Sequence, residues 1–376
     1  MLVSAIYWLG LLWPVHSLAV EIKQNNSTIS PLSVQEALQE IIKQATGESS
    51  LPHNTPKKNN LIKKKDIPKA DPKSQKKLKA VKQVSIAQIC KQIGVKLGSV
   101  SEKACLDEKF SLSGGRSVNG LPIIIKEYPP VKDRTPQARI LLLGGIHGDE
   151  FSSVSIVFKW MQTLNKHHSG LFHWRIAPLV NPDGLLRKES QRMNHNNVDL
   201  NRNFPTAATH EEWLGQSRKY WIDETERDPR RYPGPSSLSE PESRWVTEEI
   251  ERFKPHAVVS IHAPFGLLDF DGPPNIPPEK LGQLYLSLLG TYPGALGRYV
   301  GSVQRVPIIT IELEHAGIMP SKLEVKSIWK DLVTWLVGHV KDRQTLNATP
   351  IENIIINKPL AAKKEPPSNK NTPGPN

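Results

Sequence analysis

A histidine and a glutamate three residues apart follow an aliphatic segment in the middle of the chain. The run Ala138–Gly144 leads into His147 and Glu150. If the chain turns from a strand into a helix here, both side chains can be directed to one point. An imidazole nitrogen and a carboxylate are two of the three protein ligands of a catalytic zinc ion, which keeps water in its fourth position. The spacing alone is weak support, because a chain with 12 His contains it about once by chance.

The third metal ligand has to come from another part of the chain. Phe151 follows Glu150, which excludes both His-Glu-x-x-His and His-x-x-Glu-His. His262 is the candidate, because it ends a second aliphatic run, Ala257–Ile261. A single His at a strand end more often has a structural role, but ligands at two strand ends meet at one edge of a sheet. The three residues together predict a zinc site.

Two further features extend this candidate site: a loop rich in Arg and Asn, and a Glu within an apolar run. Arg and Asn are concentrated in Arg192–Asn194 and Val198–Phe204, after the turn sequence Asn181–Gly184. Such a loop is either a polar surface turn or a fork for a carboxylate, which Arg binds bidentately. Glu312 interrupts the apolar run Ile309–Leu313. A buried Glu must be paired or functional, and beside a zinc-bound water it would serve as general base.

The elements that must position these residues alternate between strands and helices. Short aliphatic runs predict strands at Ala138–Gly144, Phe172–Val180, Ala257–Ile261 and Pro307–Ile311. Helical periodicity predicts helices at Asp149–Asn165, Ser239–Phe253, Pro278–Leu289 and Ser321–Val340, with Ser239 and Glu242 as a capping box. We therefore expect an α/β fold with a mixed, mostly parallel central sheet flanked by helices.

Length and charge limit the class of protein. A chain of 376 residues is too long for a disulfide-stapled miniprotein. Its net charge of +12 is concentrated in residues 20–84, which contain 13 Lys against 6 Asp and Glu. The Lys-rich run lacks the interleaved aromatic side chains of single-strand binders, so nucleic acid is not the expected partner. We expect a disordered, Lys-rich linker, with attachment to an acidic cell-envelope surface as the alternative.

The segments on either side of the expected domain predict a signal peptide, a linker with one short helix, and a tail. Residues 1–19 are apolar at first and end in Ser17-Leu18-Ala19, which is typical of a cleaved signal peptide; an uncleaved anchor is the alternative. Within the linker, residues 31–46 have the periodicity of a short amphipathic helix. No later stretch is long and apolar enough for a membrane span. We expect a catalytic domain at 85–345, whose N-terminal segment 85–113 contains both cysteines, and a disordered tail at 346–376.

The chain contains two cysteines, Cys90 and Cys105. Export to an oxidising compartment would let them form a disulfide across a short loop. Two buried free thiols remain an alternative, as do metal ligands, although two Cys alone do not complete a tetrahedral site.

These motifs, in this order, resemble the carboxypeptidase A superfamily of zinc carboxypeptidases, and within it the compact bacterial branch of murein peptide amidases. The resemblance covers about residues 114–340 and begins with Gly115–Ile123, which looks like the opening strand motif of the family. It implies one Zn²⁺ per chain, held by His147, Glu150 and His262. It also implies that Asp199 orients His147 and that Glu312 is the general base and later the proton donor.

The resemblance assigns the remaining site residues as well. Arg192 would stabilise the oxyanion, and Asn201 with Arg202 would hold the terminal carboxylate of the substrate. The family has a tyrosine that closes over the substrate, but the best-aligned position here is Gly290. Tyr292, two residues later, is the nearest tyrosine and is assigned to this position.

The expected function is that of a secreted enzyme of the bacterial periplasm or cell envelope. It would cleave a C-terminal amide bond in a peptide or muropeptide, namely the γ-D-Glu–meso-diaminopimelate bond of peptidoglycan stem peptides. Asp269 and Asp271 would hold the diaminopimelate ammonium, or they simply make a turn. The alternatives are an N-acyl amino acid deacylase, a general C-terminal carboxypeptidase, and an inactive zinc-binding module that attaches to the cell wall.

Overall fold

A computed structural model of the chain describes residues 84–132 and 135–340. The predicted signal peptide, the amphipathic helix at 31–46 and the tail at 346–376 lie outside these residues, as does all of the linker except Val84. No helix within the two described ranges is long and apolar enough to cross a membrane.

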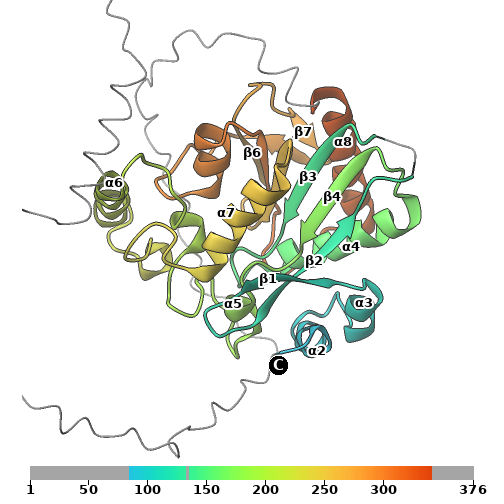
Figure 1. The fold of residues 1–376 in the computed structure, drawn as a ribbon, viewed down its shortest axis with the longest axis horizontal. Helices are drawn as coiled ribbons and strands as arrows, with labels where there is room; N and C mark the ends of the chain where they lie inside the picture. Colours follow the sequence, from blue (N-terminus) through green and yellow to red (C-terminus); the bar gives the residue numbers. More distant parts are fainter. Residues whose placement is uncertain (1–83, 133–134, 341–376) are drawn as a thin grey trace, which may run out of the picture. The chain divides into compact units, whose positions relative to one another are not determined.

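Nine strands of the described residues form one mixed sheet in the order β1-β2-β4-β3-β5-β9-β6-β8-β7 (Figure 1). The strands are β1 Ser111–Arg116, β2 Pro122–Tyr128, β3 Ala138–Leu143, β4 Phe172–Ala177, β5 Ala257–His262, β6 Leu267–Asp271, β7 Lys280–Leu281, β8 Leu284–Leu286 and β9 Ile308–Glu312. The four central strands β4, β3, β5 and β9 are parallel. The pairs β1–β2, β2–β4 and β6–β9 are antiparallel, and β6 is parallel to its other neighbour, β8. The four predicted strands are confirmed, and they are the parallel centre of the sheet.

The helices of the described residues are α2 Ile86–Lys96, α3 Glu102–Asp107, α4 Phe151–His167, α5 Pro182–Leu186, α6 His210–Asp223, α7 Pro241–Phe253 and α8 Lys322–His339. Short helical turns lie at η1 Leu200–Arg202, η2 Pro229–Arg231 and η3 Arg298–Val303. Ser321 caps α8 through a capping box with Glu324, which explains why the sequence locates this helix well.

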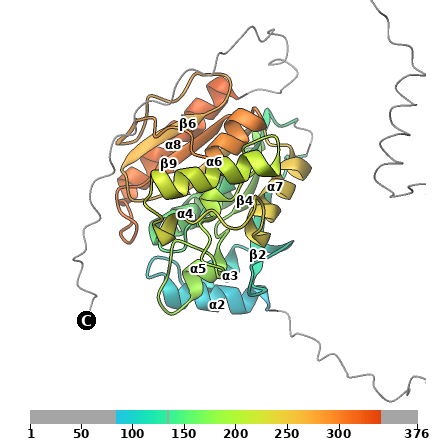
Figure 2. The ribbon, with the colours of Figure 1, turned by 90° about the vertical axis from the view of Figure 1, so that its left-hand side faces the viewer.

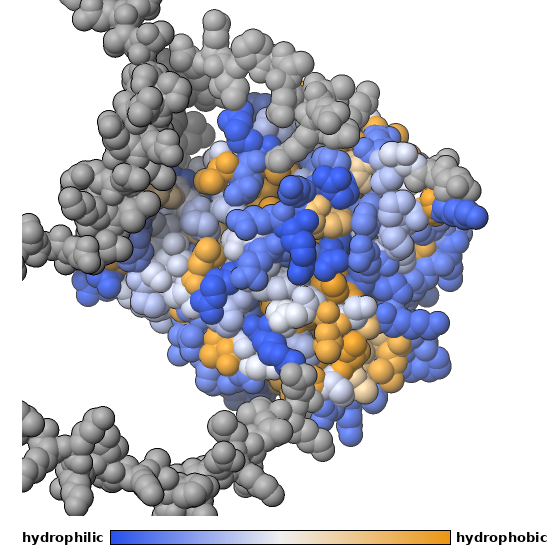
Figure 3. Space-filling model, viewed as in Figure 1, coloured by the Kyte–Doolittle hydropathy of each residue, from blue (hydrophilic) through white to orange (hydrophobic). Residues whose placement is uncertain are grey.

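Helices cover both faces of the sheet. Apolar residues of α2, α4 and α8 share one core cluster with one face, and α7 and η3 share a second cluster with the opposite face. Helix α6 lies at the side of the molecule that faces the viewer in Figure 2. On the face shown in Figure 3, apolar side chains are scattered among polar ones. The burial of both sheet faces is the reason why the central strands read as continuous aliphatic runs.

The predicted disulfide is confirmed: Cys90 of α2 is bonded to Cys105 of α3. Both residues are buried in the first core cluster. The bond therefore ties together two short helices that precede the sheet.

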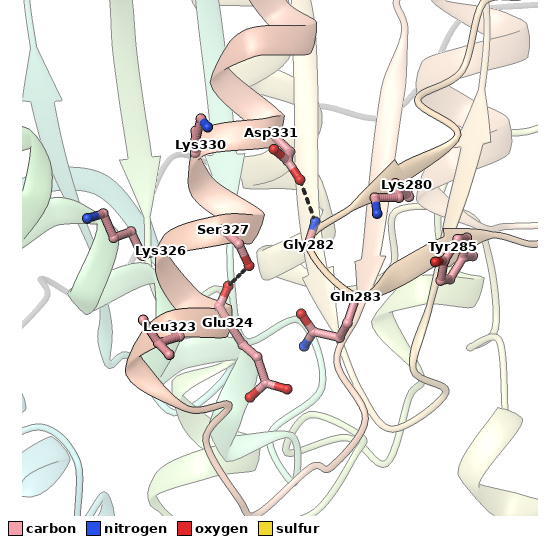
Figure 4. Close-up of a pocket in the computed structure, with 10 residues that line it drawn as sticks. All are labelled: Lys280, Gly282, Gln283, Tyr285, Leu323, Glu324, Lys326, Ser327, Lys330 and Asp331. Atoms are coloured by element: carbon pink, nitrogen blue, oxygen red, sulfur yellow. Dashed lines mark hydrogen bonds between the residues drawn. The ribbon is translucent and has the colours of Figure 1, made fainter.

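The predicted helix at Pro278–Leu289 is wrong. This segment forms the hairpin of β7 and β8, in which Leu281 pairs with Leu284. Gly282 has a φ of +60°, which suits a two-residue hairpin turn. Its N–H donates to Asp331 of α8 at 2.8 Å (Figure 4). Two Leu residues three positions apart fit a helix equally well, so the outcome depended on the pairing of β8 with β6.

The predicted capping box at Ser239 and Glu242 is also wrong. Helix α7 begins at Pro241 with Glu240 as its N-cap residue, and no side chain caps it. Ser239 donates to Glu240 at 2.7 Å, while the Glu242 carboxylate accepts from the backbone N–H of Val118 at 3.2 Å. The side chains of Ser239 and Glu242, which would otherwise cap the helix, form these other contacts instead.

Candidate active site

Three predicted metal ligands converge at the carboxyl edge of the central strands. His147 and Glu150 lie in the turn between β3 and α4, and His262 is the last residue of the neighbouring strand β5. Their ligand atoms all lie within 4.8 Å of one another, and the three side chains are 2%, 4% and 2% exposed. Residues 115 positions apart in the sequence are therefore brought to one buried point.

The chemistry of these donor atoms fits a divalent cation. Nδ1 of His147 lies 2.6 Å from Oε1 of Glu150 and 3.1 Å from Nδ1 of His262. Nδ1 of His262 lies 3.1 Å from the other oxygen of Glu150. Nε2 of His147 contacts Asp199, so in its neutral form the ring donates there and directs the lone pair of Nδ1 at Glu150. Lone pairs facing one another in a buried site need a shared positive partner, and imidazole and carboxylate ligands suit zinc.

Glu150 does not cap the helix that it precedes, because its carboxylate points to the two histidines. It is the N-cap residue of α4, yet its carboxylate makes no capping hydrogen bond. The free N–H of Ser152 instead donates to the carbonyl of Ala316 at 2.8 Å. Burial alone would raise the pKa of Glu150, but its contacts with His147 and His262 outweigh burial and lower it, so this carboxylate is ionised.

Asp199 holds both His147 and Arg192. Its Oδ1 lies 3.0 Å from Nε2 of His147, and its Oδ2 accepts from Nε and Nη2 of Arg192, both at 2.9 Å. Burial would raise the pKa of Asp199, but the charges of Arg192 and His147 outweigh it and hold that pKa well below its ordinary value. Nη1 of Arg192 also lies 3.7 Å from Oε1 of Glu150. The ionised Asp199 therefore fixes a guanidinium at the rim of the triad.

Glu312 ends β9 next to His262, with which it is in register across the parallel pair β5 and β9. It is buried, and its Oε2 has no hydrogen-bond partner within the described residues. Burial and then the charge of Glu150 raise the pKa of Glu312 well above its ordinary value. A buried carboxylate oxygen left open beside the triad is available to a water or a substrate.

Asn201 and Arg202 follow Asp199 in the turn η1. Arg202 is 4% exposed, and its Nε has no hydrogen-bond partner within the described residues. The Tyr292 ring lies 4.9 Å from its guanidinium carbon, and the Tyr292 hydroxyl donates to the carbonyl of Leu289. Oδ1 of Asn201 accepts from the N–H of Leu296 at 2.8 Å. The structure thus places Tyr292 against Arg202, and it leaves a buried guanidinium nitrogen that an anionic ligand would satisfy.

Asp269 and Asp271 lie on β6 and do not form the turn that was the alternative prediction. Leu268 and Phe270, between and beside them, belong to the first core cluster, so both Asp side chains point to the opposite face of the sheet, as Glu312 does. The Asp269 carboxylate accepts from the N–H groups of Phe270 and Leu289, whereas no hydrogen bond to the Asp271 carboxylate is found among the described residues. Burial and then Asp269 raise the pKa of Asp271 to about 7.

Residues to which the sequence assigns no site role hold the loops of this site. Asn181 is buried, and its amide donates to the carbonyls of Ile146 and Arg192, both at 3.2 Å. A Cβ at Gly148 would lie 2.1 Å from the backbone of Gly184. The loops that contain these two residues can therefore approach this closely only because residue 148 has no side chain. The Asn-Pro and Gly signals were visible in the sequence, but they indicate only turns.

Comparisons with known proteins agree with this geometry. The sequence profile of a family described as zinc carboxypeptidase matches residues 109–268. Murein peptide amidase A of Vibrio campbellii is 31% identical over 211 residues, which cover 54% of this chain and 78% of that protein. Murein peptide amidase A of Escherichia coli K12 is 36% identical over 160 residues, 41% of this chain, and the chain spans 60% of the length of that relative.

Among solved structures, murein-tripeptide amidase MpaA of Escherichia coli O157 is 27% identical, with a TM-score of 0.43, over 62% of this chain and 93% of that one. The family match, the relative from Vibrio campbellii and the buried His–Glu–His group together show that this chain belongs to the zinc carboxypeptidase family.

Proposed function

We propose that this chain is a zinc-dependent carboxypeptidase or amidase that hydrolyses a C-terminal amide bond. The observation that carries the proposal is the convergence of His147, Glu150 and His262 at a buried point, with Glu312 and Arg192 beside it. In this reading, residues 85–345 are the catalytic domain, and the three converging residues hold one Zn²⁺. Zinc bound there would polarise the scissile carbonyl and acidify a water molecule.

The residues around the metal position would handle the proton and the developing charge. Glu312 would take the proton from the attacking water and later give it to the leaving amine. Arg192, fixed by Asp199, would donate hydrogen bonds to the oxyanion of the tetrahedral intermediate. Asn201 and Arg202 would bind the terminal carboxylate, and Tyr292 would cover it from its place against Arg202. The open Nε of Arg202 and the open oxygen of Glu312 support these assignments.

We propose meso-diaminopimelate as the residue released, from its bond to γ-D-Glu in a peptidoglycan stem peptide. The names of the relatives from Vibrio and Escherichia, murein peptide amidase A, support this substrate class. Asp269 and Asp271 support it independently. They lie on the same face of the sheet as Glu312, and Asp271 packs against the backbone of Gly297, next to Leu296, which binds Asn201. A residue with its carboxylate on Arg202 and Asn201 would extend its side-chain ammonium toward this acidic pair.

We also propose that the protein acts in the bacterial periplasm or cell envelope. The apolar pattern of residues 1–19 supports export, and the Cys90–Cys105 disulfide is of the kind that persists in oxidising compartments. The Lys-rich linker would then be available for an acidic envelope surface.

The test is mass spectrometry of muropeptides and of free L-Ala-γ-D-Glu-meso-diaminopimelate after incubation with zinc-loaded protein. We expect release of diaminopimelate that a chelator abolishes and added zinc restores. Glu312→Gln should bind one zinc per chain and lose roughly 10²–10⁴-fold in kcat.

The other outcomes would redirect the assignment. Zinc at one per chain without release from either compound would contradict the proposed bond, and ordinary C-terminal peptides and acyl amino acids would then be assayed. A Glu312→Gln variant equal to the wild type in every hydrolysis assay would contradict the role of Glu312 and favour a binding module.

A further inference from the structure

A six-residue loop, residues 193–198, joins Arg192 to its partner Asp199. Asn194 closes this loop: its N–H donates to the carbonyl of Val198 at 3.0 Å, and its Oδ1 accepts from the N–H of Val198 at 3.2 Å. Asn197, inside the loop, has a left-handed φ of 59°. The closure brings residues 192 and 199 side by side, which is the geometry their ion pair requires.

The first turn of α7 holds Asn194 from the other side. The Asn194 amide donates to Oε2 of Glu240 at 2.7 Å and to Oε2 of Glu242 at 3.1 Å. Asn196 also donates to Oε2 of Glu240, at 2.8 Å. Asn194, Glu240 and Glu242 are 0%, 2% and 0% exposed. Two buried carboxylates converge on one amide, and because buried carboxylates are costly without hydrogen bonds, this arrangement holds the Asn194 amide firmly in place.

The same turn of α7 also holds the far end of the site segment. Oδ1 of Asn203 accepts from the backbone N–H of Glu240 and from the hydroxyl of Ser243. Asn203 directly follows Arg202, whose guanidinium lies in the proposed carboxylate subsite. The N-terminal end of α7 therefore forms hydrogen bonds with this segment at two positions, Asn194 and Asn203. The site residues Asp199, Asn201 and Arg202 lie between these two positions.

We propose that Asn194 and Glu240 are positioning residues for Arg192, acting through the loop that holds it against Asp199. The inference rests on the proposed function, in which Arg192 stabilises the oxyanion. Glu240 touches neither substrate nor metal in this proposal. It fixes the amide of Asn194, and Asn194 fixes the spacing between Arg192 and Asp199.

The kinetic test compares two substitutions of Glu240 that differ in the acceptor they leave. Glu240→Gln keeps an oxygen for Asn194, whereas Glu240→Met has a similar volume and no acceptor. We expect Glu240→Met to lower kcat by about 10–100-fold, because small misplacements of a catalytic group have effects of this size. KM should stay within about threefold, and Glu240→Gln should restore most of kcat. Glu248→Gln removes a carboxylate from the exposed side of the same helix and is the control.

The second readout does not depend on activity or on metal. The Arg192 Nε–H donates to buried Asp199, so in metal-free protein its NMR signal should be shifted and protected from exchange with water. We assign it by its loss in Arg192→Lys. In Glu240→Met the protection should fall at least about tenfold, in proportion to the loosening of the ion pair. If Glu240→Met does not fold, Asn194→Ser tests the same contact.

The outcomes separate the two proposals. A wild type without hydrolytic activity that still shows an Nε–H signal sensitive to Glu240 would contradict the proposed function and leave the positioning role standing. Folded Glu240→Met or Asn194→Ser protein with unchanged kcat and unchanged Nε–H protection would overturn the positioning role.

Discussion

The buried charges of the site satisfy one another in a chain of contacts, and two polar atoms beside this chain have no hydrogen-bond partner within the described residues. Asp199 is shared between His147 and Arg192, and Glu150 between His147 and His262. Among the side chains of the candidate site, Oε2 of Glu312 and Nε of Arg202 are buried without a hydrogen-bond partner in the described residues. A buried polar atom without a partner is costly, which is why the proposed function assigns the attacking water to Glu312 and the substrate carboxylate to Arg202.

Asp269 and Asp271 test the proposed substrate at the scale of single residues. Replacing both with Asn removes the negative charge that would face a side-chain ammonium. We expect kcat/KM for the diaminopimelyl tripeptide to fall by about 10–100-fold, and kcat/KM for a peptide ending in Ala to stay within about threefold. The measurement is steady-state kinetics on both substrates.

Glu248→Gln serves again as the control for loss of one exposed carboxylate. Equal losses on both substrates in the Asp269→Asn, Asp271→Asn protein would mean that the pair supports the strand and does not select the substrate.

At the scale of elements, the parallel pair of β5 and β9 does most of the positioning. Both strands end at the same edge of the sheet, so His262 and Glu312 lie side by side. β6 then returns antiparallel to β9 and adds Asp269 and Asp271 to the same face. Helix α4 contributes Glu150 from its N-terminus, at the end of β3. The site is therefore built on strand ends, with one loop segment, residues 192–203, folded over them.

The α2–α3 pair allows a prediction about an element that supplies no proposed site residue. The Cys90–Cys105 bond closes a separation of 15 residues, and loops of this size gain about 3 kcal/mol from a disulfide. The double variant Cys90→Ser, Cys105→Ser should lose about that much stability in denaturant unfolding, with the zinc content and kcat of the folded protein unchanged. A matching fall in zinc content would show that the two helices support the metal site.

At the scale of the whole molecule, buried Glu242 links stability to pH. Burial is the largest influence on its pKa and raises it from 4.5 to about 7. A carboxyl whose pKa is raised on folding favours the folded state below pH 4.5, and that contribution is lost as pH rises through 7. The difference between these two pKa values corresponds to about 3 kcal/mol in the free energy of unfolding. We expect the free energy of unfolding to fall between pH 5 and pH 8.

Glu242→Gln should reduce this pH dependence, because Gln does not ionise, and buried Asp271, whose pKa is also raised to about 7, should account for part of the slope that remains. The comparison is between the slopes of the two curves, since Gln also changes the contacts with Asn194 and Val118. Exposed Glu248→Gln should retain the wild-type slope. If Glu242→Gln retains it as well, another group causes the dependence.

The sequence by itself determined the residues that end strands and the strands that carry them. His147, His262 and Glu312 each follow or interrupt a long aliphatic run, and such runs form buried parallel strands wherever helices cover both faces of a sheet. The carboxyl ends of parallel strands meet at one edge, so the meeting of these residues follows from local pattern. The two cysteines, close in sequence, were readable in the same way.

Tertiary structure alone decided the features whose partners are distant in sequence. Glu242 and Asn194 are 48 residues apart, and the Glu242 carboxylate accepts from Asn194 and Val118 instead of forming the capping box that the local sequence predicts for α7. The segment 278–289 became a hairpin because β8 pairs with β6. In each case the local pattern fits two structures about equally well, and burial of polar groups or strand pairing with a distant segment stabilises one of them.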